Sequence, residues 1–168
     1  MTTVKHDMLK RMLVRRSFPG LMDLYEYNYK LIHRLVPILG TLQGWAISQV
    51  PGHPELYIKM DERSKFTTTV LLTYVFEVQD GEYIQDPELA IRIYHDARQA
   101  EAMSCRKDGF MALPEVGNER PPVLDCKWDS NLFLAKWLEY CLEIGHQYDE
   151  ESMLLDQDFK PGVILADA

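Results

Sequence analysis

The sequence predicts an α+β domain in which an antiparallel sheet of four to five strands carries two main helices packed on one face. Residues 66–78 alternate between large apolar side chains and mostly polar ones, with many β-branched and aromatic residues, which is typical of a long half-buried strand. Residues 19–36 and 130–144 instead repeat apolar residues three and four apart, as surface helices do. We therefore expect one face of the sheet on a core and the other in water.

The composition is that of one globular domain. A chain of 168 residues, 46% hydrophobic and 26% charged, can bury roughly 70% of its unfolded surface. No run approaches the roughly 20 apolar residues that cross a bilayer, so we expect no membrane contact. The N-terminal stretch is charged where an export signal is apolar, and the three cysteines form no CxxC motif. We expect reduced thiols in a cytoplasmic protein.

Charge is distributed unevenly along the chain. The net charge of -8 argues against nucleic acid as a partner, because phosphate contacts need a basic surface. Residues 1–16 form a basic amphipathic arm, residues 17–148 a single α+β domain, and residues 149–168 an acidic tail that is partly docked. The arm either stays solvated, docks loosely on the tail, or meets an acidic partner such as nucleic acid, anionic lipid or another protein.

The first helix is expected over residues 19–36. Ser17 suits the N-cap and Pro19 the first turn, because these residue types are favoured there. The helix has one apolar stripe, made of Leu21, Leu24, Tyr25, Asn28, Leu31, Ile32 and Leu35. Pro37 and Gly40 end the helix. Because its apolar residues form one stripe, this side of the helix is expected to pack on the sheet.

Three strands are expected next. Residues 41–50 form the first, and the Pro-Gly-His-Pro sequence at 51–54 is a turn signal. Residues 56–61 alternate again and are joined to the central strand, 66–78, by a short polar link. The second and central strands are therefore expected to pair as a hairpin.

The second half of the sheet is less regular in sequence. Asp80-Gly81 ends the central strand, and a wider connection containing Asp86-Pro87 is expected before a fourth strand at residues 89–95. Residues 97–105 are compatible with either an edge strand or a short helix. We favour a strand there, which gives the fifth member of the sheet.

A long connection precedes the second helix. Residues 106–127 would be a structureless stretch of about 20 residues, which is either a binding loop or contains an element that the pattern conceals. The helix itself is expected over residues 130–144, with Asp129 as N-cap. Trp128 is then placed to pack against Phe133 across the first turn.

The sequence lacks the common motifs of catalysis. Neither a GxGxxG nor a GxxxxGK phosphate loop occurs, and GxSxG and HExxH are also missing. The histidines have no metal-ligand spacing. We expect no cofactor and no metal site, assign no catalytic residue, and favour a protein that is not an enzyme.

The candidate binding residues cluster at the end of the fourth strand. Histidine suits proton transfer near neutral pH, and arginine binds carboxylate or phosphate through two donors. Alternation places His95 on the inward face and its neighbours on the other, so His95 and Asp96 cannot form a catalytic pair on a regular strand. The simpler interpretation is a strand-end histidine bonded to backbone, with charged neighbours paired across strands. The candidates are Arg92, Tyr94, His95, Asp96 and Arg98.

Several strings of the sequence also resemble a known family. LMDLYEYNYKLIHRLVP, KFTTTVLLTYVF, LAIRIYHDARQAEAMSC and WDSNLFLAKWLEYCLEIGHQ, in this order, resemble the YqiB-like family of uncharacterised proteins from Gram-negative bacteria. The resemblance covers residues 15–148 and rests mainly on YHDARQAE and on W-x-x-N-x-F-L-x-x-W-L, which begins at Trp128. It implies a cytoplasmic single-domain protein and transfers no catalytic residue.

Two hypotheses about function follow. In the first, the protein is a non-enzymatic binding or regulatory module that meets an unknown protein, or a second copy in a homodimer. It would use the long loop or the open sheet face with Thr67, Thr69, Thr73, Arg92 and Tyr94. In the second, it is a small-ligand receptor or enzyme with a pocket between the sheet and the C-terminal helix. His95 and an arginine would there bind a small anionic substrate.

Overall fold

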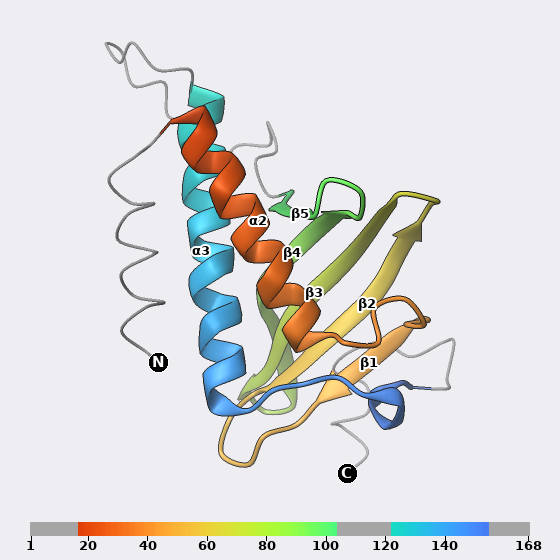
Figure 1. Cartoon of the computed structure of the whole chain (residues 1–168). Helices are drawn as coiled ribbons and strands as arrows, with labels where there is room; N and C mark the ends of the chain where they lie inside the picture. Colours follow the sequence, from red (N-terminus) through yellow and green to blue (C-terminus); the bar gives the residue numbers. More distant parts are fainter. Residues whose placement is uncertain (1–16, 104–121, 155–168) are drawn as a thin grey trace.

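The computed structural model describes residues 17–103 and 122–154. Its strands form one antiparallel sheet in the order β1-β2-β3-β4-β5, and α2 and α3 lie side by side on one face (Figure 1). The α+β prediction is thus confirmed. The elements are α2 (Phe18–Leu35), β1 (Trp45–Ser48), β2 (Glu55–Arg63), β3 (Thr67–Gln79), β4 (Glu82–Tyr94), β5 (Gln99–Ala102), α3 (Pro122–Ile144) and the 3-10 helix η1 (Glu150–Ser152).

Helix α2 begins where the sequence predicts. The Ser17 hydroxyl accepts a hydrogen bond from the Gly20 amide at 3.2 Å, and proline stands in the first turn. The predicted apolar stripe is buried, including Asn28. Local capping chemistry and the 3.6-residue period therefore suffice to place this helix.

The first strand is shorter than the sequence predicts. Only Trp45–Ser48 pair with β2, whereas a strand was expected over residues 41–50. The chain before β1 is instead a series of turns held by Arg63, whose guanidinium donates to the carbonyls of Leu39, Gly40 and Leu42 at 2.8 to 2.9 Å. This long-range contact supplies hydrogen-bond partners that a strand ladder would otherwise provide.

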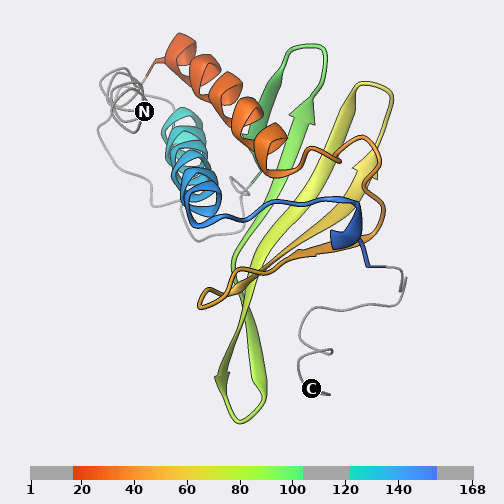
Figure 2. The same ribbon diagram turned by 60° about the horizontal axis from the view of Figure 1, so that its bottom comes forward.

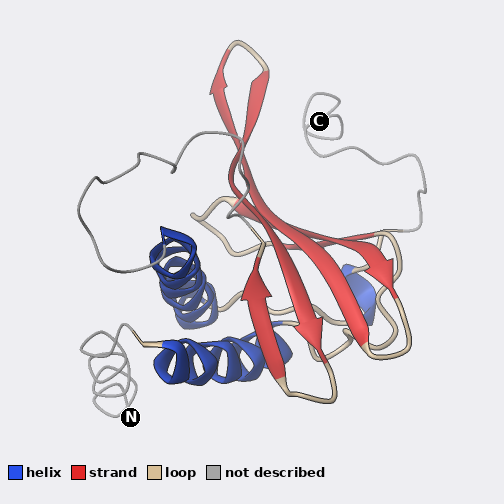
Figure 3. Ribbon diagram, turned by 90° about the horizontal axis from the view of Figure 1, so that it is seen from above, coloured by secondary structure: helices blue, strands red, loops and turns tan. Residues whose placement is uncertain are grey.

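Strands β3 and β4 form one long hairpin, and the wide connection expected around Asp86-Pro87 is wrong. The turn is only Asp80-Gly81, both with positive φ, as two-residue hairpins require. Asp86-Pro87 lies inside β4, close to the register shift between Thr73 and Val75. A bulge lets a strand accommodate proline, which cannot donate to the ladder. The tip of the hairpin extends beyond the helices (Figures 2 and 3).

Helix α3 begins earlier than predicted. It starts at Pro122, a residue type favoured in the first helical turn, so the predicted 106–127 connection already contains helix. Asp129 is therefore not the N-cap. Trp128 is fully buried inside the helix while Phe133 is 46% exposed, so the predicted packing of these two side chains is also wrong.

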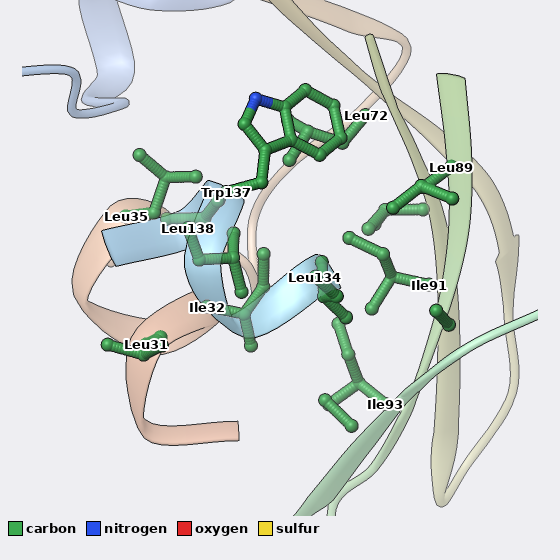
Figure 4. Packing of buried hydrophobic residues seen from close by; sticks show 14 of the residues in the cluster. Leu31, Ile32, Leu35, Leu72, Leu89, Ile91, Ile93, Leu134, Trp137 and Leu138 are labelled. Atoms are coloured by element: carbon green, nitrogen blue, oxygen red, sulfur yellow. The ribbon is translucent and has the colours of Figure 1, made fainter. Parts of the chain in front are cut away.

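The core lies between the helices and the inward face of the sheet. Figure 4 shows Ile91 and Ile93 of β4 facing Leu134 of α3, with Ile32 of α2 behind it. These side chains are completely buried. Burial of this kind stabilises by about 1.5–3 kcal/mol per large apolar side chain, so the core fixes both helices on one face.

A buried polar joint connects β5 to both helices. The Asn131 side-chain oxygen accepts from the Ala102 amide at 2.8 Å, and its nitrogen donates to the Lys127 carbonyl at 2.7 Å. The Asn28 side chain donates to the Asn131 carbonyl at 3.2 Å. Because both asparagines are fully buried, these bonds supply partners that water cannot.

The C-terminal segment returns to the sheet. Tyr148 is buried, and its hydroxyl donates to the Leu56 carbonyl at 2.7 Å. Asp149 caps η1, Met153 forms a bridge with Ala46, and the Leu154 amide donates to the Trp45 carbonyl at 2.8 Å. The start of the predicted acidic tail thus covers the edge of β1, while residues 155–168 and the predicted arm, 1–16, lie outside the described residues. Neither described helix is long and apolar enough to span a membrane.

Candidate functional site

An open groove of about 300 Å³ lies on the sheet face turned away from α2 and α3. We call it the Arg92 groove. Thr69 stands opposite Arg92 in the sheet, and Thr67 stands opposite Tyr94. Thr68 and Ile93, the paired positions between them, are buried. A bulge after Met60 brings Glu62 onto the same face, opposite Thr69. The groove is lined by Glu62, Ser64, Thr67, Thr69, Arg92 and Tyr94.

Arg92 is the cation of this groove. Its side chain is half-buried beside the Tyr94 hydroxyl, and no carboxylate in the described part of the chain forms an ion pair with it. Glu101, its cross-strand neighbour, instead accepts a hydrogen bond from Tyr94 at 2.9 Å and lies 3.9 Å from the Lys127 ammonium. The guanidinium therefore keeps donors for an external acceptor.

Tyr94 stays protonated in this setting. Burial raises the pKa of its phenol, the hydrogen bond to Glu101 raises that pKa further, and the nearby Arg92 charge opposes both. Since the phenol proton is held by Glu101, Tyr94 contributes mainly its ring and its oxygen to the groove.

The five predicted binding residues do not form one site. Arg92 and Tyr94 line the groove, whereas His95, Asp96 and Arg98 belong to the turn between β4 and β5. The His95 ring nitrogen Nε2 lies 2.8 Å from the Thr68 hydroxyl, and its amide donates to the Phe66 carbonyl. Asp96 and Arg98 are exposed.

Sequence reasoning missed two members of the groove. The sequence predicts that Glu62 and Ser64 belong to the link between strands, and simple alternation gives no reason to place them beside Thr69. The bulge in β2 brings Glu62 opposite Thr69. Such a bulge forms only when two strands pair, so the pattern of a single strand does not reveal it.

The space between the sheet and α3, where the second hypothesis expects a pocket, is occupied by core side chains. Leu134 of α3 points toward Ile91 (Figure 4), and both belong with Leu72 and Leu138 to one buried cluster. His95 lies at the end of β4, where its ring nitrogen Nε2 is 2.8 Å from the Thr68 hydroxyl. The space around Leu72, Ile91 and Leu134 is therefore filled by apolar packing.

A second polar pair is buried near the C-terminal end of α3. The Ser48 hydroxyl lies 2.8 Å from His146 Nδ1 and accepts a hydrogen bond from the Gln147 amide. Burial lowers the pKa of His146, and the charge of His53 lowers it further. Both Ser48 and His146 are buried, so the pair joins β1 to the end of α3. The sequence gives no signal for it.

The described residues hold no group of three or more potential metal ligands close together. Cys141 is free and buried, and burial raises its pKa to about 11, so its thiol is unreactive at neutral pH. Cys126 is disulfide-bonded. The prediction that all cysteines are reduced is therefore wrong for Cys126 in this structure, because pairing depends on tertiary proximity rather than sequence spacing.

Comparison with known proteins gives a family. Residues 31–147 match the family described as "Protein of unknown function (DUF1249)". The Uncharacterized protein YqiB of Escherichia coli strain K12 and that of Escherichia coli O157:H7 are each 32% identical over 130 residues, which is 77% of this chain and 91% of theirs. No solved structure matches the chain. The matched residues include the whole Arg92 groove. The chain belongs to the DUF1249 family of proteins of unknown function.

Proposed function

We propose that the protein is a non-enzymatic binding module that captures a partner protein through the Arg92 groove. The observation that supports this most is the half-buried Arg92 guanidinium, which has no carboxylate partner among the described residues and faces an open groove. A cation placed in this way favours binding of an external anion.

The groove suggests what the partner presents. Arg92 suits a carboxylate, which it can hold through two parallel hydrogen bonds. Glu62 on the opposite side suits an amide or ammonium donor, and the Thr67 hydroxyl suits either role. The Ser64 hydroxyl already donates to the Thr67 carbonyl and can accept from a ligand. A peptide segment with an acidic side chain or a terminal carboxylate, followed by a donor, supplies both groups.

The test compares capture by the full chain, an Arg92→Gln variant and a Lys136→Gln variant. Lys136 is exposed on α3, so the control removes the same charge away from the groove. We expect the wild type and Lys136→Gln to capture the same protein with equal affinity. Arg92→Gln should bind that protein at least about 30-fold more weakly, because losing one partner of a buried charge pair costs about 2 kcal/mol or more.

Thermal melting shows whether each variant is folded. If Arg92→Gln melts like the wild type and still captures every partner with unchanged affinity, the proposal is wrong. A parallel melting series with small carboxylates and phosphates identifies the source of the anion. If a small anion raises the melting temperature of the wild type but not that of Arg92→Gln, the groove binds a small ligand instead of a protein.

We also propose that the module works in the cytoplasm. The free Cys141 thiol is compatible with a reducing compartment, where the disulfide that Cys126 forms in this structure would be reduced. Alkylation of thiols in intact cells, followed by mass spectrometry of Cys126, distinguishes the two states. Alkylated Cys126 is the expected result, and a fully oxidised Cys126 would place the protein in an oxidising compartment.

A further inference from the structure

The outer part of the β3–β4 hairpin has an uncovered apolar surface. Phe76 and Ile84 stand opposite each other in the ladder and therefore share one face. Phe76 is 37% exposed, Ile84 40% and the following Val78 52%. The hairpin projects away from both helices, so no described helix shields these side chains (Figures 2 and 3). Clustered apolar exposure of this kind marks an interaction surface.

The hairpin that carries this surface is acidic. Residues 76–88 contain five carboxylates and no lysine or arginine. All five are exposed, namely Glu77, Asp80, Glu82, Asp86 and Glu88. The surface therefore fits a segment that is apolar on one side and basic on the other.

The chain itself contains such a segment. Residues 1–16 hold five lysines and arginines against one aspartate, and Met8, Leu9, Met12 and Leu13 recur among them at helical spacing. We propose that the hairpin of one copy docks residues 1–16 of a second copy. This assembly uses a surface separate from the Arg92 groove and does not depend on the proposed function.

The arrangement of the chain favours a second copy over the same copy. The N-terminal end of α2, where residues 1–16 join the domain, and the hairpin tip lie at opposite ends of the molecule (Figures 1 and 2). A helix of 16 residues is about 24 Å long, shorter than α2 itself at about 27 Å. The tip lies beyond the other end of α2 in both views, so residues 1–16 would be too short to reach it if they were helical.

Two such contacts can form at once between two copies. If the arm of each copy meets the hairpin of the other, the contacts are equivalent and the assembly closes as a dimer. We expect the full chain to dimerise with an affinity that falls at least about tenfold between low and high salt, because exposed charges are screened.

The test is sedimentation velocity on the full chain and on matched charge variants. One variant reverses the arm, Lys5→Glu with Lys10→Glu, Arg11→Glu and Arg15→Glu, so that residues 1–16 become net acidic. Another reverses the hairpin, Glu82→Lys with Asp86→Lys and Glu88→Lys, so that residues 76–88 become net basic. Each alone should be monomeric, whereas an equimolar mixture should dimerise, because both contacts in the mixed dimer again join opposite charges. The control, Lys30→Glu with Lys136→Glu, reverses two exposed charges on the helices and should dimerise like the wild type.

A third variant tests the apolar part of the contact. Phe76→Ser with Ile84→Ser should abolish dimers while leaving the melting temperature nearly unchanged, since both side chains are exposed. A wild-type chain that stays monomeric at low salt would overturn the proposal. So would a dimer that survives reversal of the arm, because another surface would then hold it.

Discussion

At the scale of single residues, a few buried polar side chains hold the elements together. Asn131 satisfies the Ala102 amide at the outer edge of β5, and His146 joins the end of α3 to Ser48. Buried groups of this kind cost more when left unpaired than their bonds contribute when formed. Substitution of such a residue should therefore lower the stability by more than the loss of one hydrogen bond.

We predict that Asn131→Ala lowers the free energy of unfolding by about 1–3 kcal/mol, because it leaves the buried Ala102 amide without an acceptor. Glu143→Ala, on the exposed side of the same helix, is the control and should change it by no more than about 0.5 kcal/mol. Denaturant unfolding measures both. Equal stabilities of the two variants would contradict this account of the joint.

We predict that the protein loses stability as the pH falls below about 6.5. Burial lowers the pKa values of His33 and His146, so between the lowered and ordinary values the unfolded chain binds more protons than the folded one. Stability therefore rises with pH in that interval and is lost on acidification. Denaturant unfolding at several pH values measures the slope.

A variant assigns part of this slope to one residue. His146→Asn retains a polar atom for Ser48 but cannot titrate, so its stability should depend less on pH than that of the wild type. His53→Asn removes an exposed histidine and should keep most of the dependence. An undiminished slope in His146→Asn would show that other groups cause the acid sensitivity.

At the scale of elements, side chains from distant parts of the chain decide where strands and turns end. The turns between α2 and β1 depend on Arg63 at the far end of β2. The bulge in β2 moves Glu62 into the groove, and the bulge between β3 and β4 accommodates Pro87. Each of these features exists only when two strands are paired.

We predict that Arg63→Gln destabilises the protein by about 1–2 kcal/mol, because three carbonyls lose a charged donor. Hydrogen exchange should increase first at the Thr41 and Leu42 amides, which are bonded within the same turns. Lys136→Gln serves as the charge-matched control. Unchanged exchange at residues 41 and 42 would mean that these turns hold without Arg63.

At the scale of the whole molecule, the sheet separates three surfaces. One face is covered by α2 and α3, the opposite face carries the Arg92 groove, and the β3–β4 hairpin projects beyond both helices (Figure 3). The groove and the exposed hairpin residues lie toward opposite ends of the same two strands. A partner in the groove and a second copy at the hairpin could therefore bind at the same time.

The sequence alone determined the α+β class, the approximate limits of α2 and the alternation of β3. These features follow from local periods and capping residues, which act within a few positions. Alternation also placed Arg92 and Tyr94 on the face opposite to that of His95, as the groove and the Thr68 hydrogen bond bear out.

Only the tertiary structure decided the extent of β1, the continuation of β4 through Asp86-Pro87, the start of α3 and the membership of the groove. In an isolated segment, proline predicts the end of a strand or helix. In the folded protein, Pro87 lies at a bulge between β3 and β4, and Pro122 lies in the first turn of α3, where proline is tolerated. The groove needs Glu62, Thr69 and Arg92 from three strands at one level of the sheet. That coincidence is fixed by strand register, which depends on pairing and packing between residues far apart in the chain.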